Sequence, residues 1–238
     1  MYSIFYYVPV YLVLAALGMS IANRSAEVIV RKQRWLKYFS YIIITGIVIT
    51  SVFFGLFKWM ALVIALAGYI ELLNIRFQTK GNLVVSLLIY GLIVSGFILF
   101  SLNFTKEAIL FIYFQVFIFD AFGQITGQLF GKRLLFPKIS PGKTFEGLIG
   151  GWLFCIISAL LGASWVNIAL SEALLFGLFT GLTSCCGDVL ASWFKRQQKI
   201  KDYSNWLPGQ GGFLDRFDSF IFTGCLYYAA GLLFKNLI

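Results

Sequence analysis

Long apolar runs constrain this chain more than any other feature of its sequence. Eight runs approach the roughly 20 residues that an α-helix needs to cross the hydrocarbon core of a bilayer. Runs such as 41–57 lack the alternation of apolar and polar residues that a membrane-spanning β-strand shows. The sequence therefore predicts an all-α fold, a polytopic integral membrane helical bundle with about 8 transmembrane helices. The predicted spans are residues 3–22, 38–57, 59–75, 82–102, 107–130, 145–163, 168–192 and 213–234.

The distribution of basic residues predicts an orientation for these spans. If residue 1 lies outside, sixteen of the nineteen Lys and Arg residues lie on the inner side, and cytoplasmic loops carry such an excess. We therefore predict that both termini face outward, N-out/C-out. The formal net charge of +9 then reflects membrane topology and attraction to anionic lipid, and we expect no nucleic-acid partner. The basic loop 23–37 is expected to mark the inner side, where it could lie on anionic headgroups.

Two residue types narrow the kinds of site that the chain can form. It has no histidine, so it lacks the usual general base and the commonest zinc ligand. Its four cysteines lie in apolar surroundings without CxxC spacing, which favours small core residues over a disulfide framework.

Polar residues gather in the stretch 187–218, between the last two predicted spans. This stretch holds four of the ten acidic residues and five of the nineteen basic ones. Charge at the end of a membrane span is costly to place, so a functional role is the default hypothesis. The acids are Asp188, Asp202, Asp215 and Asp218, and the bases are Lys195, Arg196, Lys199, Lys201 and Arg216.

The spacing of these acids places them on shared helix faces. Asp188 and Ser192 are four residues apart, and Asp215 and Asp218 are three apart. Two helices could therefore present three carboxylates to one point, where Mg²⁺ is the cation that best suits hard oxygen ligands. Because Mg²⁺ usually shares its ligand shell with substrate phosphates, this pattern favours phosphoryl or nucleotidyl transfer on a lipid phosphate.

Two further acids lie inside apolar segments. Glu71 is alone in its span, and we leave open whether it is protonated, bonded to a neighbouring helix or functional. Asp120 begins a segment in which glycines recur every fourth residue, a spacing that allows close helix packing, and we favour a functional role for it. These glycines are Gly123, Gly127 and Gly131.

The connection 131–147 contains Gly-Lys-Thr at 142–144, which resembles part of a P-loop. That motif needs a glycine at position 137, where this chain has Pro137, and no strand precedes it, so we reject a Walker A site. Lys138 and Lys143 remain suited to bind phosphate beside a helix start, and Thr144 is expected to cap the helix that follows.

Residues 192–218, SWFKRQQKIKDYSNWLPGQGGFLDRFD, resemble the hallmark motif of the phosphatidate cytidylyltransferases, or CDP-diacylglycerol synthases. The resemblance extends over roughly 115–235 and includes Gly187-Asp188, Asp120 and the segment SPGKTFEG at 140–147. It implies a Mg²⁺-dependent reaction in which an oxygen of phosphatidate attacks the α-phosphate of CTP. The products would be CDP-diacylglycerol and pyrophosphate.

The resemblance also implies a role for each matching residue. Asp188, Asp215 and Asp218 would hold the metal and, with Lys195 and Arg196, would form the catalytic group. The substrate-binding residues would be Lys143, Ser192, Arg216, Gln210 and Asp120.

One position departs from the motif. Gln210 stands where the family has histidine, and glutamine keeps hydrogen bonding but cannot become cationic. Alternatives therefore stay open: a related CTP-dependent enzyme acting on a different lipid phosphate or a prenol, or a non-catalytic lipid-binding paralogue.

The sequence predicts one membrane domain, 1–238. In it, 1–105 would supply N-terminal spans and the basic loop, and 106–238 the catalytic region. We expect a bacterial inner-membrane protein with a cytoplasmic active-site loop, and homodimer formation is compatible with this interpretation.

Overall fold

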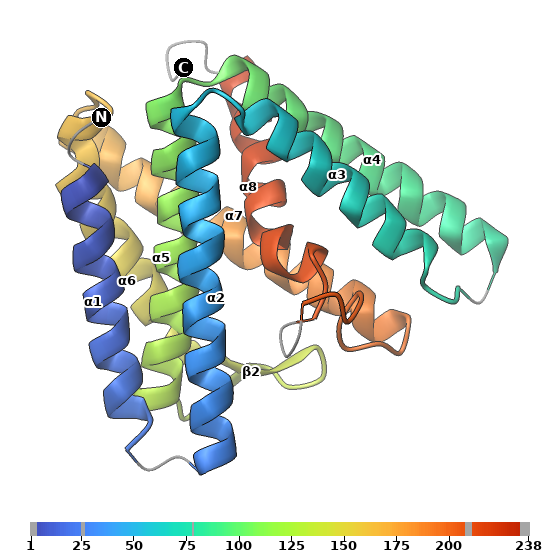
Figure 1. Cartoon of the computed structure of the whole chain (residues 1–238), viewed down its shortest axis with the longest axis horizontal. Helices are drawn as coiled ribbons and strands as arrows, with labels where there is room; N and C mark the ends of the chain where they lie inside the picture. The colour runs from blue at the N-terminus through green and yellow to red at the C-terminus, as the bar shows by residue number, and fades with distance from the viewer. Residues whose placement is uncertain (1–3, 25–26, 78, 208–210, 234–238) are drawn as a thin grey trace. The chain divides into compact units, whose positions relative to one another are not determined.

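The computed structural model describes residues 4–24, 27–77, 79–207 and 211–233 (Figure 1). In these ranges the chain is mainly α-helical, with one short antiparallel hairpin. The α-helices are α1 (Ile4–Ala22), α2 (Val28–Phe53), α3 (Phe57–Leu73), α4 (Lys80–Asn103), α5 (Lys106–Phe130), α6 (Phe145–Gly162), α7 (Leu170–Gln197) and α8 (Leu214–Leu233). The strands are β1 (Leu134–Phe136) and β2 (Ser140–Thr144), and a 3₁₀ turn covers Ala163–Trp165.

Five of the described helical segments are long and apolar enough to cross a membrane. They are Val28–Phe53, Gly81–Asn103, Lys106–Phe130, Phe145–Trp165 and Leu170–Gln197. The fold is therefore that of an α-helical membrane protein, in agreement with the predicted class.

Each predicted span corresponds to one helix, with most ends shifted by a few residues. The exception is α2, which begins at Val28 and not near residue 38, so the prediction that 28–37 is a loop is wrong. This segment has neither Gly nor Pro, and its Arg, Lys, Gln and Leu residues are good helix formers. Its charges indicate a side of the membrane but do not prevent helix formation. Arg34 then donates to the carbonyl of Ala22 at 2.9 Å and so satisfies a terminal carbonyl of α1.

The hairpin was not predicted, and β1 precedes the Gly-Lys-Thr at 142–144, where no strand was expected. Leu134 pairs with Thr144 and Phe136 with Ser140, so the connection between α5 and α6 is ordered. The predicted helix cap is confirmed, because the hydroxyl of Thr144 accepts a hydrogen bond from the amide of Gly147 at 3.1 Å.

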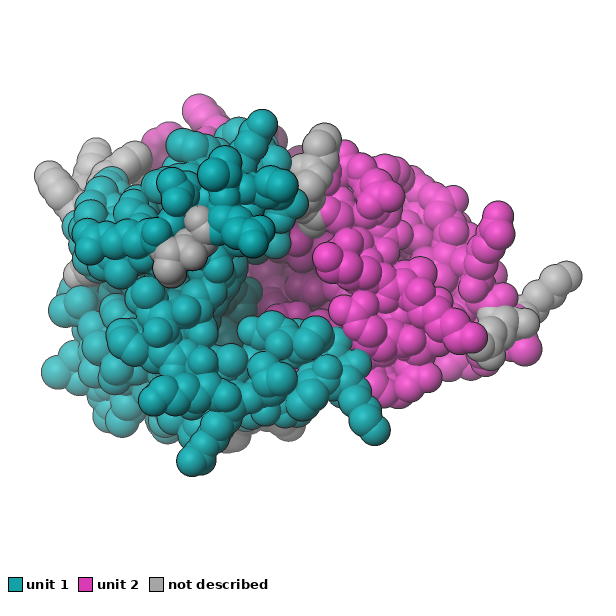
Figure 2. Space-filling model, turned by 90° about the horizontal axis from the view of Figure 1, so that it is seen from below, with its two compact units in different colours: residues 1–47, 110–182 teal, residues 48–109, 183–238 magenta. Residues whose placement is uncertain are grey.

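The chain forms two compact units, which Figure 2 colours separately. Unit 1 comprises residues 1–47 and 110–182, and unit 2 comprises residues 48–109 and 183–238. The two units interleave along the sequence, because each combines an N-terminal segment with a later one.

In unit 1, α5 lies beside α1, α2 and α6 (Figure 1). The predicted close packing of its glycines is confirmed. A Cβ on Gly123 would lie 3.4 Å from the carbonyl oxygen of Gly147, and one on Gly127 would lie 3.6 Å from the Cα of Gly147. Small residues on both helices thus bring the two backbones together, as is common where helices associate in a membrane.

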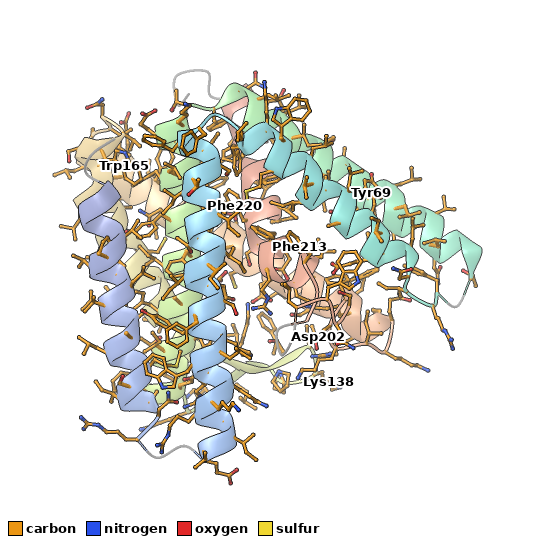
Figure 3. The ribbon with its side chains drawn as sticks, viewed as in Figure 1. Tyr69, Lys138, Trp165, Asp202, Phe213 and Phe220 are labelled. Atoms are coloured by element: carbon orange, nitrogen blue, oxygen red, sulfur yellow. The ribbon has the colours of Figure 1, made fainter. Side chains whose placement is uncertain are left out.

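In unit 2, α8 packs against α3, α4 and the last part of α7. Phe220, labelled in Figure 3, places its ring 5.3 Å from that of Phe97 and 6.1 Å from that of Phe57. A Cβ on Gly187 of α7 would lie 3.2 Å from the Cα of Ser219 on α8. Aromatic packing and this close helix approach position the start of α8, where the predicted site residues lie.

Candidate active site

Two of the predicted carboxylates adjoin a close contact between α7 and α8. Asp188 follows Gly187, and Asp218 precedes Ser219, the residue that Gly187 touches. The hydroxyl of Ser192 donates to Asp188 Oδ1 at 3.3 Å, which confirms that these two residues share a helix face. Two hard oxygen donors thus belong to neighbouring turns of two packed helices.

The third predicted carboxylate, Asp215, forms a buried ion pair. Lys195 Nζ lies 2.5 Å from Asp215 Oδ1, and the two side chains are 9% and 2% exposed. The same ammonium group lies 5.1 Å from the centroid of the Tyr203 ring, within the range of a cation–π interaction. Because desolvating both charges is costly, the pair depends on good geometry and on further hydrogen bonds to the carboxylate.

Those further hydrogen bonds come from the loop that joins α7 to α8. Asp215 Oδ2 accepts the backbone amides of Tyr203 and Gly212, each at 2.8 Å. Gly211 has a φ of +85°, and a Cβ there would lie 2.9 Å from Asp215 Oδ2. One carboxylate therefore holds both sides of the loop, and the close approach of the backbone requires glycine at 211.

The basic residues at the end of α7 also shape this loop. Arg196 donates to the carbonyl of Ile200 at 2.8 Å. Lys199 adopts a φ of +57°, and the amide of Ile200 donates to the carbonyl of Lys195, so the helix ends in a left-handed turn. Arg216 lies in the first turn of α8, beside Asp215.

Sequence reasoning missed Tyr203. This residue is buried and stacks on Phe194, with ring centroids 6.1 Å apart and planes at 22°. Burial raises the pKa of its phenol well above the ordinary value, and the negative charges of Asp218 and Asp215 add to the effect. Tyr203 directly follows Asp202 in a stretch rich in charged residues, but nothing in the sequence linked its ring to Lys195 or to the other carboxylates.

Glu71 was noticed in the sequence, but its partners were not identified. It is completely buried on α3, and Glu71 Oε1 accepts the hydroxyl of Ser204 at 2.6 Å and the amide of Phe213 at 2.7 Å. Glu71 Oε2 accepts the amide of Leu214 at 2.7 Å. Of the alternatives left open, the structure supports bonding to a neighbouring element.

The other predicted site residues belong to other elements of the chain. Asp120 lies on α5 and Lys143 on β2, both in unit 1. In the same unit, Glu146 accepts the amides of Lys132 and Arg133 at 3.0 and 3.2 Å and so joins the two ends of the hairpin connection. Gln210 lies outside the described residues.

The predicted metal site would need the carboxylates of Asp188, Asp215 and Asp218 to gather at one point. Among residues 4–24, 27–77, 79–207 and 211–233, no three His, Cys, Asp or Glu side chains gather closely enough to hold a metal ion. Asp215 directs both carboxylate oxygens to a lysine and to backbone amides. A metal site built of Asp188, Asp215 and Asp218 together therefore stays a prediction.

Comparisons with known proteins relate the chain to one family and to several curated relatives. The model of a family described as the Cytidylyltransferase family matches residues 1–234. The uncharacterized protein YnbB of Escherichia coli (strain K12) is 45% identical over 103 residues, which make up 43% of this chain and 35% of that protein. The phosphatidate cytidylyltransferase of Aquifex aeolicus (strain VF5) is 42% identical over 115 residues, 48% of this chain and 43% of that protein. That of Staphylococcus saprophyticus is 43% identical over 117 residues, 48% of this chain and 45% of that protein. In each case the chain spans less than half the length of the relative that it matches.

Proposed function

This chain belongs to the Cytidylyltransferase family, and on that premise we propose that it transfers a cytidylyl group from CTP to phosphatidate. An oxygen of phosphatidate would bond to the α-phosphorus of CTP while the bond to the β-phosphate breaks. The products would be CDP-diacylglycerol, an intermediate for phospholipid biosynthesis, and pyrophosphate. The observation that carries the proposal is the concentration of carboxylates and cations around the α7–α8 loop of a membrane protein whose relatives include phosphatidate cytidylyltransferases.

The proposed chemistry does not need the histidine that the chain lacks. The attacking phosphate is already ionised near neutral pH, so positioning and charge neutralisation can provide most of the catalysis. Arg196, in the last turn of α7, and Arg216, at the start of α8, would hold the phosphates, and the ammonium of Lys195 would use an N–H donor that its pair with Asp215 leaves over. A guanidinium group has five N–H donors, so the bond from Arg196 to Ile200 is compatible with such a role.

Substrate binding would involve the other residues that the motif singles out. We propose that Ser192 orients a phosphate from the face that it shares with Asp188. Asp120, Lys143 and Gln210 keep the substrate-binding roles that the resemblance implies, as predictions.

The donor chemistry of the site fits Mg²⁺ when two carboxylates hold it. Mg²⁺ is usually bound in proteins by one or two carboxylates, with water and substrate phosphates completing its ligands. Asp188 and Asp218 adjoin the contact between α7 and α8 and would provide this pair. Asp215 would first have to give up a buried ion pair and two amide bonds. When bound, Mg²⁺ would supply charge neutralisation at the phosphates.

The membrane arrangement is the second part of the proposal. Eight spans with both termini outward would place the α7–α8 loop on the cytoplasmic side, where CTP is available. The inner membrane is proposed because the named relatives are bacterial. A cysteine introduced at the exposed Asn205 should react with a membrane-impermeant maleimide only after the cytoplasmic face is opened. Reaction in intact cells would refute this orientation.

The decisive experiment is pyrophosphate release by the purified full chain with CTP, Mg²⁺ and phosphatidate. Release that requires both substrates would support the proposal. Release of CDP without pyrophosphate would indicate a lipid kinase. Absence of turnover with bound phosphatidate would favour a different acceptor or a non-catalytic paralogue, and Gln210 would then be the first residue to examine.

A further inference from the structure

The proposed reaction leaves one buried acid without a role. Glu71 is completely buried, and it lies at least 133 residues away in sequence from the residues that it binds. Within the described part of the chain it makes three hydrogen bonds, all to the α7–α8 loop or to the start of α8, at 2.6 to 2.7 Å. Glu71 acts as the acceptor in each of them.

These bonds satisfy backbone groups that a helix cannot satisfy itself. The first four N–H groups of an α-helix have no partner within the helix, and the N-terminal end attracts negative charge. Glu71 accepts the amides of Phe213 and Leu214, and Asp215 accepts the amide of Gly212. Three successive amides at the beginning of α8 are thus bound by carboxylates of the protein itself.

The two carboxylates explain why the loop has glycine at positions 211 and 212. A Cβ on Gly212 would lie 2.5 Å from Glu71 Oε1, just as a Cβ on Gly211 would lie 2.9 Å from Asp215 Oδ2. Each glycine therefore makes room for one carboxylate. A phosphate that used the amides of 212–214 would have to displace these carboxylates, so the glycine pair serves internal packing in this structure.

We propose that Glu71 is a positioning residue for the reaction. By fixing the start of α8 and Ser204 in the loop, it would hold Asp215 beside Lys195 and keep Asp218 beside the α7 contact. This inference rests on the proposed function, because it assigns a task at the same site. A misplacement of about 1 Å at a reacting centre can lower turnover strongly without weakening substrate binding.

The experiment compares Glu71→Gln with wild type and with Glu172→Gln, all as the full chain. Glutamine keeps the size of Glu71 but has no charge. One carboxylate oxygen is replaced by an N–H₂ group, which cannot accept a hydrogen bond. Glu172 also accepts a backbone amide at a helix start, that of Ala169 at 2.9 Å, but it belongs to unit 1 and is only half-buried, so it is the control.

Two readouts separate positioning from general stability. The first is the rate of tryptic cleavage after Lys199 and Lys201 in the folded protein, with cleavage after the exposed Arg24, in the turn that follows α1, as an internal reference. We expect Glu71→Gln to raise loop cleavage about tenfold relative to the reference, equivalent to about 1.4 kcal/mol. The second readout is steady-state turnover of phosphatidate. We expect Glu71→Gln to lower kcat about tenfold and to leave KM for phosphatidate unchanged. Glu172→Gln should match wild type in both.

Unchanged loop cleavage in Glu71→Gln would overturn the proposal, as would faster cleavage with unchanged kcat. If wild type shows no turnover, the proposed function fails by itself, and the cleavage comparison still decides whether Glu71 holds the loop. If Glu71→Gln does not fold, Ser204→Ala removes one of the three bonds and leaves the buried charge intact. It should raise loop cleavage in the same direction, and an unchanged rate would refute the inference.

Discussion

The Lys195–Asp215 pair allows a quantitative test of the site geometry. Asp215→Asn keeps the shape of the side chain and removes its charge. The asparagine carbonyl can still accept the amides of Tyr203 and Gly212, but its N–H₂ group then faces the ammonium of Lys195. Breaking a buried ion pair by changing one partner costs about 3–5 kcal/mol. The retained amide bonds and the nearby Tyr203 ring place the expected cost at the lower end, about 3 kcal/mol.

Thermal unfolding of the purified chain in detergent, with a chelator present, measures this cost. For a chain of this length, about 3 kcal/mol corresponds to a decrease in Tm of roughly 6–12 °C. The double variant Lys195→Met/Asp215→Asn should recover part of the loss, because an apolar side chain does not need a charged partner. Asp188→Asn serves as the control, because it neutralises a carboxylate on α7 that is not part of the Lys195–Asp215 pair.

A Tm within about 2 °C of wild type for Asp215→Asn would refute this reasoning. It would mean that the buried pair contributes little to stability and that Asp215 is available as a metal ligand. The two roles predict different behaviour, because a residue that only binds metal should not stabilise the metal-free protein.

The other predictions concern single positions of the site and its supports. Asp188→Asn and Asp218→Asn should each abolish Mg²⁺-dependent pyrophosphate release while the protein stays folded, and retained turnover in both would refute the proposed metal pair. Gln210→His should preserve or raise turnover of phosphatidate, whereas complete loss would show that the pocket serves another substrate. Thr144→Ala should lower the free energy of unfolding by about 1 kcal/mol through loss of the helix cap, and an unchanged Tm would contradict this. Because the folded-state pKa of Tyr203 is raised by burial and nearby carboxylates, stability is fully present below pH ~10, where tyrosines of the unfolded chain ionise. The free energy of unfolding should fall above that pH, and an equally steep fall in Tyr203→Phe would contradict this assignment.

Local patterns in the sequence predicted where the helices lie, one close contact between helices and one helix cap. Apolar runs located eight helices to within a few residues, apart from the start of α2. The spacing of Gly123 and Gly127 correctly indicated a close helix contact, and Thr144 was recognised as a cap. The hairpin escaped prediction because its strands are three and five residues long and lie in a polar connection rich in Gly and Pro.

The partners of the charged residues could not be predicted in the same way. Spacing placed Asp188 with Ser192 because both lie on one helix, where the geometry repeats every turn. It gave no indication that Glu71 binds Leu214, since these residues are 143 positions apart and meet only when α3 packs against α8.

The sequence by itself determined that this is a helical membrane protein, and the motif at 192–218 indicated its family, because span length and motif spacing are local properties. Only the tertiary structure decided that Asp215 holds Lys195 and the loop, and that Glu71 completes the start of α8. The physical reason is that a buried carboxylate needs donors, and folding alone brings those donors to it.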